Sequence, residues 1–496
     1  MNKRIIPVLF VLLLILTGCT KETCAAHTDT NGDDICDTCK QSVLVIVDLY
    51  CINDLHGRIL DSGTQPGIDE LTTFLDSAKE TDDHVILLSA GDMWQGSAES
   101  NLTKGQLVTD WMNSLDFAAM ALGNHEFDWG EDYIADNAQL ADFPFLAINV
   151  YDSQTDMQAA YCKSSVMVEC GGIQVGIIGA IGDCYSSIAP DMVRDVYFKT
   201  GDALTELVMA ESEALRTQGA DLIVYILHDG SGSSTNGAAV TVDGEKLSSY
   251  YDTALSDGYV DIVFEGHSHK QYLLTDEYGV PHLQNGGDNN GGITHAELQV
   301  HSINGDVEIR TAELIPTDQY DELEDSVLIA ELLEKYKASV APALQVYGHL
   351  ETSVPGNDLK QIVADMYYLE GMVRWGSEYP IALGGGYINV RNPGYLARGE
   401  VTYADLMELF PFDNELVLCA IKGKDLVDRF LESDNYYICR DEVLCSEIDP
   451  DEIYYIVVDS YTSTYAPNRL VEIERYGEPL YARDLLGNYI ANGGLN

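Results

Sequence analysis

The stretch GNHEFDWG, residues 123–130, places an amide, an imidazole and two carboxylates together, directly after a short apolar run at residues 117–122. An apolar run of this length, bounded by glycine, is typical of a buried strand. Polar residues at a strand end can cap the helix that follows, or they can belong to a reaction centre. The other strand ends of the chain decide between these two interpretations.

Short apolar runs alternate with amphipathic stretches from about residue 42 onward. The predicted strands cover residues 42–52, 85–90, 117–122, 145–150, 175–181, 222–227 and 262–265. The predicted helices cover residues 68–79, 106–115 and 203–218. A closing hairpin is expected around Asn304-Gly305. Apolar strands separated by helices predict an α/β fold with a sheet buried on both faces.

Five of the predicted strands are followed by aspartate, histidine or asparagine. The motifs are Asp54-Leu55-His56-Gly57, Gly91-Asp92, Gly123-Asn124-His125, His228-Asp229 and Gly266-His267-Ser268-His269. Each motif alone is explained by a turn or a solvated loop. Because open α/β sheets bind ligands at the carboxyl ends of their strands, the joint occurrence of these motifs predicts a binding site.

The residue types at these strand ends suit two divalent metal ions of the Zn, Mn, Fe or Co class. One aspartate can bridge two ions, and such a pair can clamp phosphate oxygens during displacement at phosphorus. The chain carries 27 Lys and Arg against 81 Asp and Glu, a net charge of −54. This charge disfavours a nucleic-acid polymer as partner, and bound cations would offset it locally at a phosphate site.

The order D-x-H-G, G-D, G-N-H-E-F-D-W-G, a histidine after an apolar strand, and G-H-S-H resembles the calcineurin-like metallophosphoesterases. GNHEFDWG in particular resembles their 5′-nucleotidase and UDP-sugar hydrolase branch. The resemblance implies an α+β sandwich with a central two-sheet core. The implied ligands of one ion are Asp54, His56, Asp92 and His269, and those of the second are Asp92, Asn124, His228 and His267.

The same resemblance implies a catalytic dyad of His125 and Asp128. In that mechanism a metal-bridging hydroxide attacks phosphorus, while His125, oriented by Asp128, donates to the phosphoryl oxygens. Glu126, Phe127 and Trp129 are assigned to loop shaping and packing.

The resemblance covers residues 42–496 and divides them into three parts. A phosphoesterase domain is expected over residues 42–316 and a connector helix within residues 317–355. A smaller α/β substrate-binding domain is expected over residues 356–496. The spacing of apolar residues predicts a single helix over residues 326–346.

Residues 383–417 resemble the core of the family's nucleotide-binding domain, but GGGY stands where an Asn-Gly-Gly-x-Ile-Arg motif is usual. Arg391 is therefore the expected substrate contact in place of the displaced arginine. Phe412 matches the family's first base-stacking aromatic, and Tyr465, with Tyr461 as the alternative, is the candidate for the second.

The N-terminus resembles a bacterial lipoprotein signal. A basic start and an apolar core precede Leu16-Thr17-Gly18-Cys19. Residues 1–18 are therefore expected to be removed and Cys19 to be lipidated, which would hold the exported protein at the outer face of the bacterial cytoplasmic membrane.

The segment over residues 19–41 is rich in cysteine, histidine and aspartate. Cys24-x2-His27 and Cys36-x2-Cys39 have the spacing of a structural zinc site. Asp29, Asn31 and Asp33 resemble the start of a calcium loop, and a disulfide-stapled spacer is the third interpretation.

The remaining cysteines divide into one expected disulfide, Cys439–Cys445, and a group of buried thiols. The predicted buried thiols are Cys51, Cys162, Cys170, Cys184 and Cys419.

The expected function is a lipid-anchored 5′-nucleotidase, with 2′,3′-cyclic-nucleotide phosphodiesterase and UDP-sugar hydrolase as alternatives. A surface binding lipoprotein that has lost catalysis is the alternative of another class, and the complete ligand set argues against it.

Overall fold

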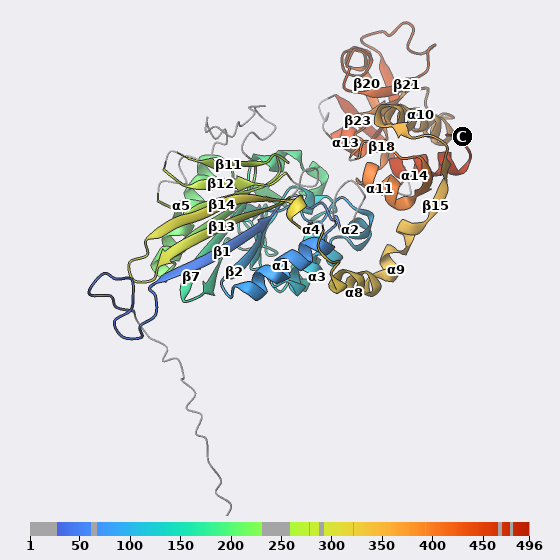
Figure 1. The fold of residues 1–496 in the computed structure, drawn as a ribbon. Coiled ribbons are helices and arrows are strands. Elements are labelled where there is room, and N and C mark those ends of the chain that lie inside the picture. Colours follow the sequence, from blue (N-terminus) through green and yellow to red (C-terminus); the bar gives the residue numbers. More distant parts are fainter. Residues whose placement is uncertain are drawn as a thin grey trace, which may run out of the picture.

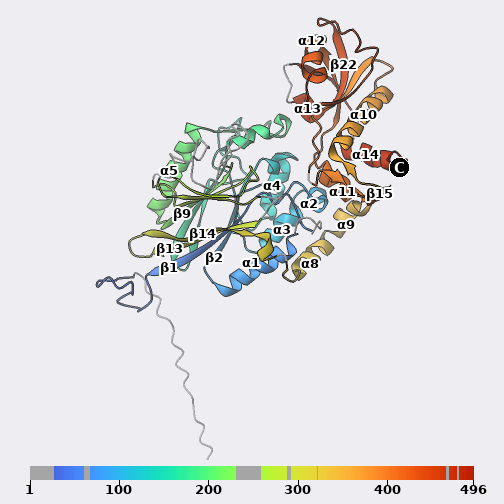
Figure 2. The ribbon, with the colours of Figure 1, turned by 45° about the horizontal axis from the view of Figure 1, so that its top comes forward.

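The computed structural model describes residues 27–60, 67–230, 258–276, 278–286, 292–320, 322–391, 393–464, 469–476 and 480–495. Two lobes are joined along one side by α8 (Val327–Lys335) and α9 (Lys337–Val340) (Figures 1 and 2). Within the described ranges, no helix is long and apolar enough to cross a membrane. The predicted signal peptide, Cys19 and Cys24 lie outside the described residues.

Two six-stranded sheets form the centre of the N-terminal lobe, with orders β14-β13-β1-β2-β3-β4 and β11-β12-β10-β9-β7-β6. The first contains β1 (Leu44–Ile52), β2 (Val85–Ser89), β3 (Ala119–Ala121), β4 (Phe145–Leu146), β13 (Gly292–His301) and β14 (Val307–Pro316). The second contains β6 (Ser165–Cys170), β7 (Ile173–Ile181), β9 (Leu222–His228), β10 (Ile262–Glu265), β11 (Tyr272–Thr275) and β12 (Pro281–Gln284). Strands β1 to β4 are parallel to one another, as are β7, β9, β10 and β12.

The two sheets pack face to face around a shared apolar core. Fully buried members of this core are Val47, Leu49 and Leu88 on the first sheet and Val175, Val224 and Phe264 on the second. Helices α1 (Asp69–Thr81), α3 (Gln106–Ser114) and α4 (Glu131–Leu140) pack on the outer face of the first sheet. Helix α5 (Asp202–Gln218) packs on the outer face of the second. This arrangement confirms the α+β sandwich with a central two-sheet core.

The closing hairpin around Asn304-Gly305 is confirmed by the antiparallel pairing of β13 with β14. The single strand predicted over residues 145–150 is wrong. It divides into β4 and β5 (Val150–Asp152), and β5 pairs instead with β8 (Val196–Phe198) in a separate ribbon.

The prediction of one continuous helix over residues 326–346 is also wrong. Helix α8 ends at Lys335, and the short α9 is followed by a 3-10 turn at Ala341–Leu344. Pro342 lies in that turn, where its ring disfavours a continuing α-helix and its nitrogen has no hydrogen to donate. Strand β15 (Val346–Leu350) then begins inside the predicted helix.

A five-stranded sheet of order β21-β17-β22-β20-β23 forms the centre of the C-terminal lobe. Its strands are β17 (Ile381–Gly386), β20 (Leu416–Lys422), β21 (Tyr437–Arg440), β22 (Ile453–Asp459) and β23 (Leu470–Arg475). Helix α10 (Gly356–Arg374) lies directly against β17. A Cβ atom at Gly384 would lie 2.1 Å from the backbone nitrogen of Tyr368, so this close approach of helix and strand requires glycine.

The expected disulfide between Cys439 and Cys445 is wrong, because both thiols are free. Cys439 is held on β21 opposite Gly384, whereas the Cys445 thiol donates to the carbonyl of Ala382 at 3.4 Å. The five predicted buried thiols are free and buried.

Candidate metal and phosphate site

The five polar strand ends meet at one edge of the two-sheet core. The segment after β1 runs alongside the segment after β2, because the backbone N–H of Asp54 donates to the Gly91 carbonyl at 2.9 Å. The N–H of His56 likewise donates to the Asp92 carbonyl at 3.0 Å. Asn124 follows β3, His228 ends β9, and two further histidines, His267 and His269, follow β10.

Five of the seven predicted ligands have a left-handed backbone conformation. Their φ angles are 50° at Asp54, 51° at His56, 55° at Asp92, 74° at His267 and 54° at His269. The described residues contain ten non-glycine positions of this kind, so half of them are predicted ligands. Such conformations cost of order 1–3 kcal/mol each and cluster at functional sites, which supports a functional interpretation of this edge.

All seven predicted ligands lie close together, in two overlapping groups. In the first, His56 Nε2 lies 3.1 Å from His269 Nε2, which lies 3.5 Å from Asp54 Oδ1. In the second, His228 Nε2 lies 3.0 Å from Asp92 Oδ2 and 3.2 Å from Asn124 Oδ1.

His267 belongs to the second group as well, because its Nδ1 lies 2.9 Å from Asn124 Oδ1. The ligand atoms of Asp54, Asp92 and His228 lie within 4.8 Å of one another, so Asp54 reaches both groups.

The imidazole orientations fit a bound cation. His56 Nδ1 lies 2.8 Å from the Gln95 carbonyl, and His228 Nδ1 lies 2.6 Å from the Ala90 carbonyl. A carbonyl only accepts, so both Nδ1 atoms carry hydrogen, and a neutral ring then presents its Nε2 lone pair to the site. Metal-binding histidines usually donate their second nitrogen in this way. The lone pairs and carboxylate oxygens that converge here match the donor set of divalent transition metals.

The electrostatics of the cluster also favour a cation. Burial opposes a charged imidazole at His228, but the Asp92 carboxylate outweighs it and raises the pKa of His228 to about 10. Burial lowers the pKa of His267 to about 3, so that ring is neutral and available as a ligand.

The GNHEFDWG loop closes over Asp92. A Cβ atom at Gly123 would lie 2.2 Å from Asp92 Oδ1, so only glycine leaves room for this carboxylate. Glu126 is fully buried and accepts the backbone N–H groups of Gly123, Asp92 and Met93 at 2.7–2.9 Å. Glu126 therefore ties two strand ends together, which is a more specific role than general loop shaping.

His125 and Asp128 form the predicted pair. Asp128 Oδ2 lies 2.7 Å from His125 Nδ1, and the backbone N–H of His125 donates to Asp92 Oδ1 at 2.8 Å. Burial disfavours the charged imidazole, but Asp128 and Asp92 raise the pKa of His125 above its ordinary value. The loop thus favours an imidazolium beside the seven ligands.

A pocket of about 470 Å³ lies between this edge and the C-terminal lobe. Asn124, His125 and His267 line it from the first lobe, and Arg391 and Phe412 line it from the second. The Phe412 ring stacks on His125 at 5.8 Å between centroids, and the Arg391 guanidinium lies 5.6 Å from the Phe412 ring centre. Arg391 also lines a smaller pocket beside His56, so it lies where the two lobes meet.

The second predicted aromatic, Tyr465, lies outside the described residues. Its alternative, Tyr461, lines the pocket together with Tyr387, and their ring centroids are 6.1 Å apart. Tyr387 follows the triple glycine directly, and its position after the end of β17 is the only sequence signal that could have identified it.

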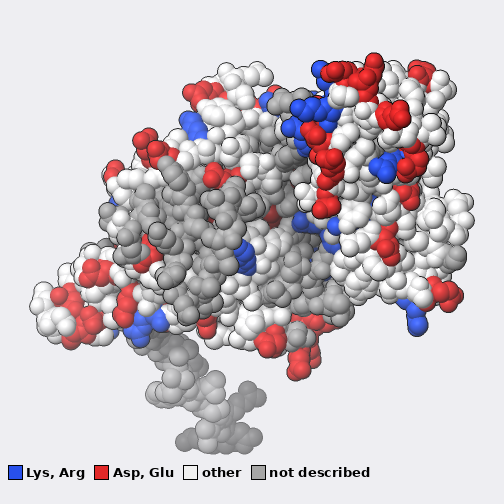
Figure 3. Space-filling view, turned by 90° about the horizontal axis from the view of Figure 1, so that it is seen from above, with Lys and Arg blue, Asp and Glu red and all other residues white. Residues whose placement is uncertain are grey.

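Ion pairs across the lobe boundary were not predicted. Lys104 Nζ lies 2.9 Å from Asp413, which also pairs with the buried Arg483, and Arg475 lies 2.9 Å from Asp191. On the face seen from above, Lys and Arg side chains are sparse, and several of them lie where the two lobes adjoin (Figure 3). The pairs hold basic side chains close to the pocket of a strongly acidic chain.

The ligand atoms of Cys184, His228 and His267 all lie within 4.8 Å of one another. Burial raises the pKa of its thiol well above the ordinary value, and the thiol donates to the His228 carbonyl at 2.8 Å. A neutral thiol is a poor ligand, so the prediction of a buried thiol is the better description.

A two-sheet sandwich with carboxylate, amide and imidazole groups at its strand ends defines the class of metal-dependent phosphoesterases. Residues 48–271 match the family model of calcineurin-like phosphoesterases, and residues 349–483 match that of the 5′-nucleotidase C-terminal domain. The chain belongs to the 5′-nucleotidase family of calcineurin-like metallophosphoesterases, which are metal-dependent phosphoric ester hydrolases.

Curated relatives are similar to this chain in sequence, and a solved structure is similar in fold. A 5′-nucleotidase of Vibrio vulnificus is 26% identical over 76% of this chain and 73% of its own length. Endonuclease YhcR of Bacillus subtilis is also 26% identical over 76% of this chain, but the match spans only 32% of that protein. A 5′-nucleotidase precursor of Thermus thermophilus has the same fold, with a TM-score of 0.68, 18% identity, and coverage of 90% of this chain and 96% of that one.

Proposed function

We propose that this chain is a nucleotide phosphohydrolase that releases phosphate from nucleoside 5′-monophosphates at the strand-end site. The observation that carries the proposal is one continuous pocket, lined by His125 and Asn124 on one side and by Phe412, Tyr387 and Arg391 on the other. Aromatic faces suit a base, and a guanidinium suits a phosphate. The relatives named 5′-nucleotidase support the same substrate class.

The seven strand-end side chains are the proposed ligands of two divalent ions of the Zn, Mn, Fe or Co class. When bound, such ions activate a water molecule for attack on phosphorus and stabilise negative charge on the phosphoryl oxygens. The Asn124 oxygen, within 3.2 Å of both His228 and His267, completes the second group.

His125 is the proposed donor to the phosphoryl oxygens, and Asp128 is its positioning residue. The 2.7 Å contact to Asp128 fixes the ring, so that Nδ1 faces the carboxylate and Nε2 is left for the substrate. Arg391, at the lobe boundary, is proposed to bind the phosphate or ribose-phosphate group.

The substrate proposal is tested by metal depletion of the full chain, refilling with Mn, Zn or Co, and assay on five substrates. These are AMP, UDP-glucose, 2′,3′-cyclic AMP, ribose 5-phosphate and single-stranded DNA. We expect AMP to have the highest kcat/KM and DNA to be uncut, because a charge of −54 repels a polyanion. Preferred cleavage of UDP-glucose or cyclic AMP would replace the 5′-nucleotidase assignment, and no turnover with any metal would favour a binding lipoprotein.

Phe412 is predicted to act on the base and not on the phosphate. Phe412→Leu should raise KM for AMP roughly 5- to 150-fold, because stacking on a base contributes about 1–3 kcal/mol. KM for ribose 5-phosphate, which has no base, should change little. Tyr395→Leu is the control, since Tyr395 is exposed on the same lobe and does not line the pocket. Equal KM changes for both substrates would contradict base stacking.

Export and lipidation at Cys19 remain a proposal that the sequence of residues 1–19 supports. Cys19→Ala should release the protein from the cell envelope into the culture medium, because the lipid anchor is lost. Fractionation with an antibody to the chain measures this. Retention of Cys19→Ala in the membrane fraction would show that another element holds the protein there.

A further inference from the structure

Residues 27–42 form a small loop module in front of β1. The N–H of Cys36 donates to the Gln41 carbonyl at 2.8 Å, and the N–H of Lys40 donates back to the Cys36 carbonyl at 2.9 Å. Lys40 has a φ of 60°, which turns the chain sharply after Cys39. This backbone turn brings both cysteines of the C-x2-C motif to the same side.

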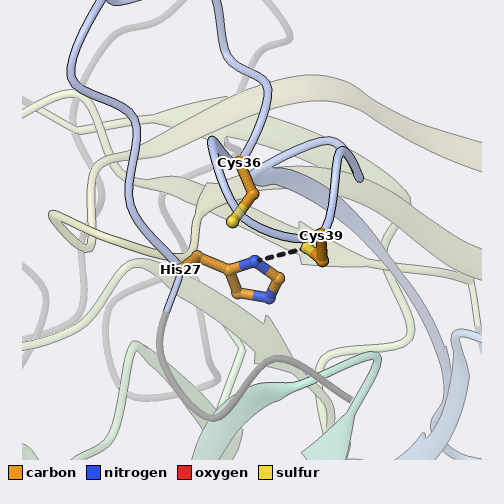
Figure 4. A group of neighbouring side chains, drawn as sticks. All are labelled: His27, Cys36 and Cys39. Atoms are coloured by element: carbon orange, nitrogen blue, oxygen red, sulfur yellow. Dashed lines mark hydrogen bonds between the residues drawn. The ribbon is translucent and has the colours of Figure 1, made fainter. Parts of the chain in front are cut away.

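His27 faces the two cysteines (Figure 4). The Cys39 sulfur lies 3.5 Å from His27 Nδ1, and the ligand atoms of His27, Cys36 and Cys39 all lie within 4.8 Å of one another. Two sulfurs and one imidazole at these separations are a donor set that zinc prefers.

The module has almost no apolar core of its own. Cys36 is its only buried residue, and the rest of residues 27–42 are exposed or half-buried. A segment of this size without an apolar core is not held by hydrophobic burial and needs a metal or a covalent link. The described residues show no disulfide between Cys36 and Cys39.

Three of the four acidic side chains of the module accept backbone N–H groups. Asp29 accepts the N–H groups of Gly32 and Asp34 at 2.8 and 2.9 Å, and Asp37 accepts that of Thr30 at 2.8 Å. Asn31 donates to the Asp33 carboxylate at 2.9 Å. These side chains close turns, which favours the thiolate site over the calcium loop.

We propose that Cys36, Cys39 and His27 bind a structural zinc ion that folds residues 27–42 into a rigid spacer before the catalytic domain. The spacer is attached to the sheet, because the N–H of Val43 donates to the Asp34 carbonyl and that of Ser302 donates to the Val43 carbonyl. It lies at the amino end of β1, whereas Asp54 and His56 follow the carboxyl end. Nine residues of strand span about 30 Å, so the zinc is remote from the phosphate chemistry.

Cobalt substitution tests this proposal, because thiolate ligands give Co(II) an intense near-ultraviolet charge-transfer band that nitrogen and oxygen ligands do not. The seven strand-end ligands contain no thiolate. Cys184 lies beside them but donates its thiol hydrogen to the His228 carbonyl, so loss of the band from a Cys36/Cys39 double variant assigns it to those two cysteines. We expect the Co(II)-loaded full chain to show the band, with an intensity that corresponds to one thiolate-bound cobalt per chain. Cys36→Ser/Cys39→Ser should lose the band and about one zinc per chain in elemental analysis, with AMP turnover within about twofold of wild type.

Cys439→Ser is the matched control, since Cys439 is a half-buried free thiol that belongs neither to the His27–Cys36–Cys39 group nor to the strand-end ligands. It should keep the band, the zinc and the turnover. The proposal is overturned if the wild-type chain shows no band, if the double variant keeps it, or if thiol titration finds Cys36 and Cys39 joined by a disulfide. The proposed phosphohydrolase fails on a different readout, turnover, so the two failures are distinguishable.

Discussion

His125→Ala should lower kcat for AMP by about 10²- to 10⁴-fold while both active-site ions stay bound. The expected loss is that of a positioned general acid. The side chain is not among the seven ligands; its Nδ1 lies 2.7 Å from Asp128, and Phe412 stacks on its ring. Steady-state kinetics and elemental analysis of the same preparation measure the two quantities.

His349→Ala is the control for His125→Ala, because His349 is exposed on β15 in the C-terminal lobe. It should leave kcat and metal content unchanged. Asp128→Asn should lower kcat less than His125→Ala, since it leaves the ring in place but weakens its orientation. Loss of an ion from His125→Ala would contradict the dyad and make His125 a ligand.

Asp92→Asn should remove metal and lower AMP turnover by more than about 10³-fold. Asp92 is 1% exposed, and its Oδ2 lies 3.0 Å from His228 Nε2. The substitution removes the negative charge that would bind the proposed ions and that faces the His228 imidazole. It also places an amide N–H₂ group, which cannot bind a cation, among the ligand atoms. Loss of one preorganised charge of this kind typically costs 10² to 10³, and loss of an ion adds to that.

Asp110→Asn controls for the general cost of altering a buried aspartate. Asp110 is 8% exposed on α3, where it pairs with Lys335 on α8. This variant should lower the unfolding temperature but keep its metal content and kcat. If Asp92→Asn retains both ions and near-normal turnover, Asp92 is not a ligand and the strand-end site is wrongly assigned.

The strand-end cluster could be predicted because its signals are local. Each motif follows an apolar run, and parallel strands bring their carboxyl ends to one edge, so Asp54, Asp92 and His228 meet although they are far apart in sequence. The two-sheet core could be predicted only through the resemblance. Apolar runs alone do not say whether the strands form one sheet or two, and the edge strands β6 and β11 were not predicted.

Contacts between distant segments account for what the sequence did not reveal. Glu126 interacts with backbone groups of Asp92 and Met93, more than thirty positions away, and nothing in GNHEFDWG indicates those partners. Tyr387 and Arg475 reach the pocket only because the two lobes meet there. The single helix predicted over residues 326–346 is wrong for a local reason, because Pro342 lies in the 3-10 turn that follows α9 and disfavours a continuing α-helix.

Metal titration of the depleted chain is the most direct test of a two-ion phosphohydrolase at the strand-end site. The Cys36→Ser/Cys39→Ser variant is stripped of metal, titrated with Mn(II), and followed by phosphate release from AMP. The account predicts no turnover without metal and a rise that saturates at about two equivalents per chain. Turnover by the fully stripped chain, or none with Mn, Zn or Co at any ratio, would contradict it.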